Sequence, residues 1–152
     1  MPHSRFDYEI YIRTTPEKLW DFLTRPELTQ QYWSQTTQEC RWTPGSPWQM
    51  KNPKGLVTDS GEVVECEPGK RLVLAWRHEF FPEFHAEGLT KVTYTLEPAG
   101  SAVKFNLHHE IERENSGYIA CLATCWPLLL SSLKSLIETG QPLEETRYWP
   151  EM

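Results

Sequence analysis

The sequence lacks a long apolar segment. Its longest uncharged apolar stretch runs from Tyr118 to Leu133, contains Pro127 and several hydroxyl side chains, and is shorter than the ~20 apolar residues of a membrane-spanning helix. The first residues, Met1 to Arg5, do not show the basic region and apolar run of a secretory signal. We therefore expect no membrane span and a cytoplasmic location.

Basic residues are also scarce. Lys and Arg number 15 against 21 Asp and Glu, which gives a formal net charge of −6. A nucleic-acid-binding face needs a basic stripe that displaces counterions, so we expect no nucleic-acid partner. Hydrophobic residues make up 39% of the chain and aromatic residues 12%, which is enough for a core. At 152 residues the chain is expected to form one domain, residues 1–152, with its core at about 6–140 and a tail at 141–152.

Several signatures of catalysis and metal binding are absent. The sequence contains no nucleophile elbow, no phosphate-binding glycine loop and no His-Glu-x-x-His. Of the four cysteines, Cys121 and Cys125 are spaced to share one face of a helix, whereas structural zinc takes four converging ligands and a tighter cysteine pair. A helix also holds two such thiols in a geometry unsuited to a disulfide. We expect reduced, buried cysteines, no metal and no cofactor.

Hydrophobic patterning defines the N-terminal elements. Apolar and polar residues alternate from Phe6 to Ile12, which predicts a strand with one buried face. Thr15 followed by Pro16 predicts the capped start of a short helix. Pro26 ends that helix, and a second short helix follows, ending near Trp33.

From about residue 38 the chain consists of short strand-like runs separated by turns rich in proline and glycine. This punctuation predicts an antiparallel sheet with one solvated face. The predicted strands are Gln38–Trp42, Trp48–Lys51, Leu56–Glu65, Arg71–Arg77, Gly88–Glu97 and Ala102–Ile111.

One long helix closes the sequence. It is predicted from Ser116–Gly117 to Glu138–Thr139, with Gly140 as its C-terminal stop and a kink at Pro127. Its apolar face needs a partner, and the concave side of the sheet is the large apolar surface left to cover it. The expected fold class is therefore α+β: a curved antiparallel β-sheet wrapped around a long C-terminal α-helix, with two short helices after the first strand. A sheet curved around one helix tends to leave a cavity that can hold an apolar ligand.

Four sequence segments, taken in their order along the chain, resemble those of a known superfamily. They are Thr15–Trp20, Tyr32-Trp33, Gly61–Pro68 with Arg71-Leu72 and Trp76, and Trp126–Gly140. Together they resemble the START-like, helix-grip superfamily (SRPBCC, birch-pollen-allergen-like), and within it the domain related to the activator of the heat shock protein 90 ATPase. The resemblance implies a helix-grip fold with a hydrophobic cavity. The superfamily includes lipid carriers, polyketide cyclases, hormone receptors and chaperone activators, so the resemblance also implies a link to the stress response but does not choose among these functions.

Candidate ligand-binding residues come from the inward faces of the predicted strands and helix. They are Trp48, Leu74, Trp76, Tyr94, Phe105, Leu107, His109, Tyr118, Leu122, Cys125 and Leu129. Alternation places His109 on the buried face, where it would either contact a ligand or act as a base, or else hydrogen-bond to a neighbouring strand or the helix. The segment Glu79–Phe84 is either a mobile apolar flap at the cavity edge or a simple hairpin loop.

Three functions follow from these features. The first is non-enzymatic binding of a small hydrophobic or aromatic molecule, lipid or polyketide-like, with no catalytic residue. The second is interaction with a chaperone through the exposed sheet face and the Trp149 tail. The third is a cyclase- or hydrolase-like enzyme that uses His109 as its base. The expected partner is a small hydrophobic ligand or, in the second case, a chaperone, and the sequence leaves open a monomer or a homodimer.

Overall fold

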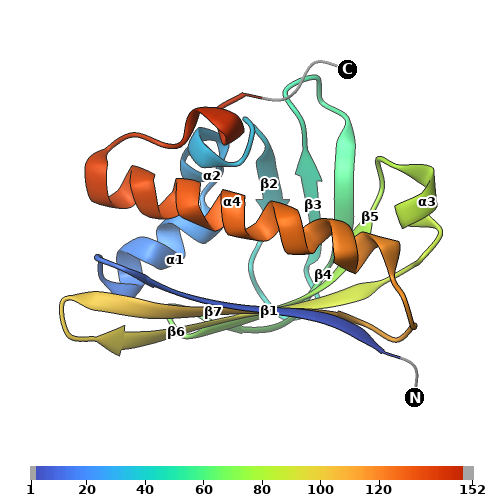
Figure 1. The fold of residues 1–152 in the computed structure, drawn as a ribbon, viewed down its shortest axis with the longest axis horizontal. Coiled ribbons are helices and arrows are strands. Elements are labelled where there is room, and N and C mark those ends of the chain that lie inside the picture. Colours follow the sequence, from blue (N-terminus) through green and yellow to red (C-terminus); the bar gives the residue numbers. More distant parts are fainter. Residues whose placement is uncertain (1–2, 149–152) are drawn as a thin grey trace.

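The computed structural model describes residues 3–148, in which seven strands form one antiparallel sheet in the order β1-β7-β6-β5-β4-β3-β2 (Figure 1). The sheet curves, and the long helix α4 lies across its concave side. The elements are β1 (Ser4–Ile12), α1 (Pro16–Thr24), α2 (Pro26–Tyr32), β2 (Thr37–Cys40), β3 (Pro47–Lys51), β4 (Val57–Glu67), β5 (Arg71–His78), α3 (Pro82–His85), β6 (Thr90–Ala99), β7 (Ala102–Ile111), α4 (Gly117–Thr139) and the 3₁₀ turn η1 (Glu144–Thr146). This arrangement confirms the predicted α+β fold class.

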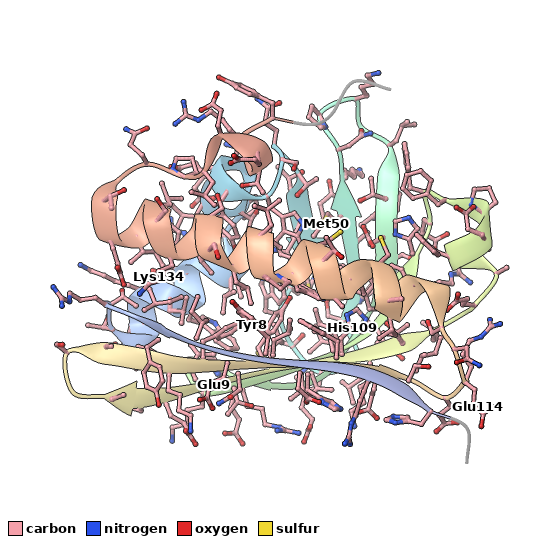
Figure 2. The ribbon with its side chains drawn as sticks, viewed as in Figure 1. Tyr8, Glu9, Met50, His109, Glu114 and Lys134 are labelled. Carbon is pink, nitrogen blue, oxygen red and sulfur yellow. The ribbon has the colours of Figure 1, made fainter. Side chains whose placement is uncertain are left out.

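The period-two pattern of β1 and β7 sets the two faces of the sheet. In β7, Val103 and Phe105 are buried while Lys104 is half-exposed. Figure 2 shows the same alternation in β1, where Tyr8 points toward α4 and Glu9 points to the outer face. The inner face therefore supplies the core and the outer face meets solvent.

The short helices α1 and α2 cover the far end of the sheet. Thr15 caps α1, its hydroxyl accepting a hydrogen bond from the Lys18 backbone N–H at 3.2 Å. The Gln38 side chain donates to the Leu23 carbonyl at 2.9 Å and accepts from Trp48 Nε1 at 2.9 Å. This buried amide joins the end of α1 to strands β2 and β3.

Helix α4 is the central core element. It begins at a Ser116 cap, whose Oγ accepts a hydrogen bond from the Ile119 N–H at 3.0 Å. It ends at Gly140, whose φ of 86° lies in the left-handed region that glycine adopts without strain. The helix runs on through Pro127, whose missing N–H would have met the carbonyl of Ala123 on the exposed face. Among the described residues α4 alone is long and apolar enough to cross a membrane, but its buried side chains pack on the sheet as a core helix.

The structure corrects some predicted boundaries. The predicted strand Gln38–Trp42 ends at Cys40, because Trp42 has a φ of 56° and cannot continue a strand. The loop predicted at Glu79–Phe84 overlaps the single helical turn α3, which extends to His85. The tail forms η1, whose buried Thr146 donates to Ser132 Oγ at 2.6 Å. The hypothesis about Trp149 lies outside the described residues.

Candidate functional site

A cavity of about 380 Å³ lies between the first half of α4, the start of β4, the end of β5, the α3 segment and η1. Its lining residues are Trp33, Ser34, Asp59, Trp76, His78, Phe81, Phe84, Tyr118, Cys121, Leu122, Cys125, Trp126, Leu128, Leu129, Glu145 and Thr146. The size lies within the range of small-molecule sites, and most of the lining is apolar or aromatic with a few polar groups, the usual character of such a site.

Three indoles form the floor of this cavity. The rings of Trp33 and Trp76 stack with centroids 6.0 Å apart, and Trp126 meets Trp33 edge-on at 5.5 Å. Each indole comes from a different element: the end of α2, β5 and α4. The buried Trp48 supports Trp76 from behind, with ring centroids 4.4 Å apart. The floor is thus held by packing from three directions.

One polar pair, Asp59 and His78, interrupts the aromatic lining. The two residues face each other across β4 and β5. Asp59 Oδ2 accepts a hydrogen bond from Trp76 Nε1 at 2.7 Å and lies 3.3 Å from His78 Nδ1. The His78 ring is packed among Phe81, Phe84 and Tyr118, with ring centroids 5.3 to 5.7 Å away. The pair is therefore held rigidly on one wall.

His109 lies between the sheet and α4 (Figure 2), and it is not among the cavity-lining residues. Its Nδ1 accepts from Trp126 Nε1 at 3.2 Å, and its Nε2 lies 2.7 Å from the Thr90 hydroxyl, which itself donates to the Trp76 carbonyl at 2.7 Å. Burial, followed by the nearby His108, lowers the pKa of His109 to about 3. The ring is thus neutral with both nitrogens engaged, and its visible role is to orient Trp126.

Two thiols line the other wall. Cys121 Sγ and Cys125 Sγ lie 3.9 Å apart on α4, and both residues are exposed, which corrects the expectation of buried cysteines. That expectation failed because the α4 face on which they lie borders the open cavity rather than the packed sheet. Within residues 3–148, no group of three or more His, Cys, Asp or Glu side chains is placed to hold a metal ion.

Alkylation of Cys125 by iodoacetamide is expected to keep accelerating up to about pH 10 to 11. Desolvation of the thiol, followed by the neighbouring Cys121, raises the pKa of Cys125 to about 11. Because the thiolate is the nucleophile, the rate should rise by about tenfold per pH unit below that pKa. Peptide-resolved mass spectrometry measures the rate, and the same peptide in urea is the control. Equal plateaus near pH 9 in both states would contradict the expectation.

The structure separates the predicted site residues into two groups. Those that line the cavity are Trp76, Tyr118, Leu122, Cys125 and Leu129. Those that lie in the core away from the cavity lining are Trp48, Leu74, Tyr94, Phe105, Leu107 and His109. Alternation along the strands shows which side chains face inward, but not whether an inward side chain borders the cavity or is covered by other side chains. Aromatic side chains cover the middle of the sheet, so the residues there do not reach the cavity.

Sequence reasoning missed other lining residues. Asp59 and His78 meet only through the β4–β5 register, which a single sequence does not reveal. Trp33 and Trp126 lie in the predicted helices, and the sequence pattern does not show that their rings face the cavity. The Glu79–Phe84 segment carried a usable signal, since its two aromatic residues Phe81 and Phe84 do lie at the cavity edge.

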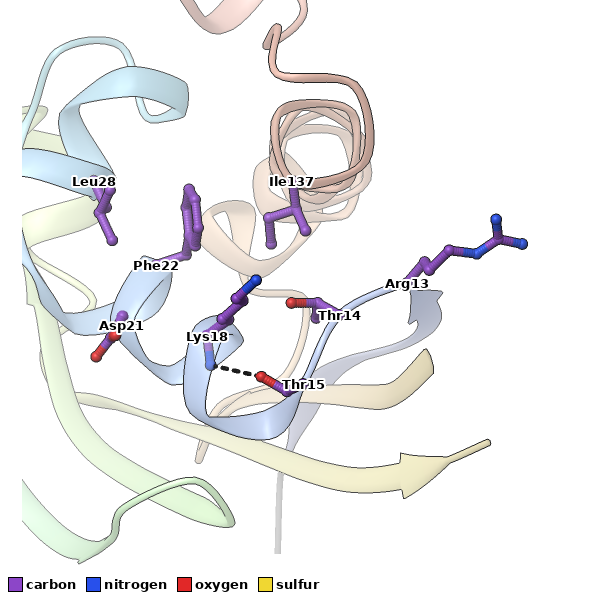
Figure 3. A pocket seen from close by; sticks show the side chains of 8 residues that line it. All are labelled: Arg13, Thr14, Thr15, Lys18, Asp21, Phe22, Leu28 and Ile137. Atoms are coloured by element: carbon purple, nitrogen blue, oxygen red, sulfur yellow. Dashed lines mark hydrogen bonds between the residues drawn. The ribbon is translucent and has the colours of Figure 1, made fainter. Parts of the chain in front are cut away.

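A second hollow of about 420 Å³ lies between α1 and the C-terminal end of α4 (Figure 3). Its lining residues are Arg13, Thr14, Thr15, Lys18, Asp21, Phe22, Leu28 and Ile137. Three of these carry charge, and covering them with an apolar molecule would cost solvation energy. The aromatic cavity is the better site for an apolar ligand.

The curved antiparallel sheet, the single long helix across it and the cavity between them define a helix-grip fold of the START-like superfamily. Residues 13–138 match the family described as "Activator of Hsp90 ATPase homolog 1-like protein", and the chain belongs to this family. A comparison with curated protein sequences finds no match.

Solved structures share the fold at low sequence identity. Protein MLL2253 from Mesorhizobium loti is 23% identical, with a TM-score of 0.74 over 89% of this chain and 97% of that one. The Aha1 dimer from Colwellia psychrerythraea is 21% identical, with a TM-score of 0.71 over 90% and 98%. DynU16, from the dynemicin biosynthetic locus, is 20% identical, with a TM-score of 0.74 over 96% of this chain and 51% of that one.

Proposed function

We propose that this cytoplasmic protein binds a small hydrophobic or aromatic molecule, lipid or polyketide-like, in the cavity above Trp33, Trp76 and Trp126, and does so without catalysing a reaction. The observation that carries the proposal is the aromatic lining of a cavity of about 380 Å³. Burial of a ligand there would contribute roughly 2.5 kcal/mol for each 100 Å² of apolar surface removed from water. The indole floor favours a planar ring, which can stack or meet the rings edge-on.

The base proposed from the sequence supports no catalytic role. His109 lies outside the cavity lining, and its two ring nitrogens are engaged by Thr90 and Trp126. The similarity to DynU16, a protein of a biosynthetic locus, supports a secondary metabolite as the natural ligand.

Filling the cavity is expected to weaken binding of naphthalene by tenfold or more. Leu122 is half-buried on the α4 wall, and an indole in its place would occupy the ligand's space. Equilibrium dialysis of naphthalene against wild type and Leu122→Trp measures the loss. Leu89→Trp is the matched control, because Leu89 is 61% exposed and lies outside this cavity. Equal affinity of the two variants would contradict the assignment of the site.

A chaperone partner is the alternative, and the family description and the Aha1 dimer support it. On this alternative the protein acts in the stress response and contacts the chaperone through the outer face of the sheet. The similarity to the Aha1 dimer also supports a homodimer. Addition of the protein to purified heat shock protein 90 would then raise its ATPase rate. An unchanged rate would count against the alternative and leave the ligand-binding proposal in place.

A further inference from the structure

One nitrogen on the cavity wall has no hydrogen-bond partner. Among residues 3–148, His78 Nε2 is buried and pairs with no other group, although the other ring nitrogen faces Asp59. An unpaired buried polar atom is energetically unfavourable. A ligand group that reached Nε2 would recover that energy, so this atom marks a place where the cavity can recognise a polar part of its ligand.

The hydrogen bonds around Asp59 decide what Nε2 offers. Asp59 Oδ2 is an acceptor, already bonded to Trp76 Nε1 at 2.7 Å, so the nearby Nδ1 of His78 carries the hydrogen. In the neutral form of the imidazole the second nitrogen then holds a lone pair and accepts, whereas a protonated ring would donate from both nitrogens, so the selectivity proposed below is that of the neutral form. The matching ligand group is a hydroxyl donor.

The route to Nε2 passes the α3 segment. Phe81 stacks on the His78 ring at 5.5 Å and Phe84 meets it edge-on at 5.7 Å. None of the four described residues of α3 is buried, and Phe81 is 39% exposed. Glu87, just after this turn, accepts from Ser116 Oγ and the Gly117 N–H and ties the segment to α4. The exposed Phe81 side chain can therefore move at less cost than a core element, while the backbone stays attached.

We propose that the cavity selects planar aromatic ligands that carry a phenolic or enolic hydroxyl, with this hydroxyl donating a hydrogen bond to His78 Nε2. The inference rests on the proposed binding function and adds the chemical class of the ligand. His78 is the contact residue, and Asp59 is a positioning residue that fixes the tautomer of its ring. The rings of the ligand lie over the indole floor while the hydroxyl points to the β4–β5 wall.

The test compares ligands that differ in one group. Equilibrium dialysis measures the affinities of 2-naphthol, 2-methoxynaphthalene and 2-acetylnaphthalene for the wild-type protein. We expect 2-naphthol to bind about tenfold more tightly than the methyl ether, against the order of hydrophobicity. Equal affinities, or a preference for the ketone, which would need a donor at Nε2, would overturn the inference while leaving the binding function intact. Failure of all three to bind would overturn both.

Variants separate the hydrogen bond from the fold. In His78→Phe the preference for 2-naphthol should disappear while 2-methoxynaphthalene still binds, which also shows that the cavity has formed. His85→Phe is the matched control, because its side chain is 46% exposed and outside the cavity lining, and it should keep the preference. Survival of the preference in His78→Phe would overturn the proposal.

The tautomer gives a second readout. In Asp59→Ala the oxygen that accepts at Nδ1 is removed, so the hydrogen is no longer fixed on Nδ1 and can also occupy Nε2. The preference for 2-naphthol over 2-acetylnaphthalene should then weaken, and the ¹⁵N resonances of the two His78 nitrogens should lose their distinct protonated and unprotonated character. Unchanged selectivity alongside changed ¹⁵N resonances would show that His78 does not contact the ligand.

Discussion

Replacing Gly61 with alanine is expected to lower the free energy of unfolding by about 3 kcal/mol or more. A Cβ atom built at Gly61 would lie 1.7 Å from the carbonyl oxygen of Ala75 and 2.7 Å from its carbonyl carbon. Both atoms belong to the backbone of the adjacent strand β5, so no side-chain rotation relieves the clash. Strands β4 and β5 must separate locally for the alanine to fit.

Urea denaturation measures this effect, and Val64→Ala is the matched control in the same strand. Val64 is 49% exposed, so its truncation should cost less than about 1 kcal/mol. The substitution should also displace the tryptophans at the cavity floor, because Gly61 pairs with Trp48 in β3 and with Trp76 in β5. An unfolding midpoint of Gly61→Ala equal to that of Val64→Ala would show that the sheet tolerates a side chain there.

Acid is expected to destabilise the wild-type protein more than it destabilises His109→Gln. Burial lowers the pKa of His109 from an ordinary value of 6.5 to about 3 in the folded state. Below pH 6.5 the unfolded chain binds a proton at this residue and the folded chain does not. Lowering the pH therefore favours unfolding, by about 1.4 kcal/mol per pH unit between pH 6.5 and pH 3.

Urea unfolding at pH 7.5, 5.5 and 4.5 tests this linkage. The variant loses hydrogen bonds to Thr90 and Trp126, so it should be the less stable protein at pH 7.5. Because glutamine does not titrate, the difference between the two proteins should shrink by about 2.7 kcal/mol by pH 4.5. Subtracting the two curves removes the common effect of the carboxylates. A difference that stays constant with pH would mean that His109 titrates alike in both states.

Much of the fold could be predicted from the sequence because its signals are local. Alternation in β7, the Thr15-Pro16 cap of α1 and the Gly140 stop of α4 each depend on a few neighbouring residues. The end of β2 was missed because the left-handed φ of Trp42 is imposed by the turn that follows, not by the preference of tryptophan.

The site was harder to predict because it depends on depth and register. Phe105 and Leu122 both face inward, yet Phe105 fills the core and Leu122 borders the cavity. The pairing of Asp59 with His78 follows from a register that contains a bulge further along β4. Alternation along the strand favoured His109 because it placed the side chain on the buried face, whereas its hydrogen bonds to Thr90 and Trp126 depend on the tertiary structure.

The most direct test of the account is the position of a bound aromatic molecule. Intermolecular nuclear Overhauser effects between naphthalene and the methyl groups of the labelled protein report it. We expect contacts to Leu122 and Leu129, which line the aromatic cavity. Contacts confined to Leu28 and Ile137, in the charged hollow beside α1, or no binding at all, would contradict it.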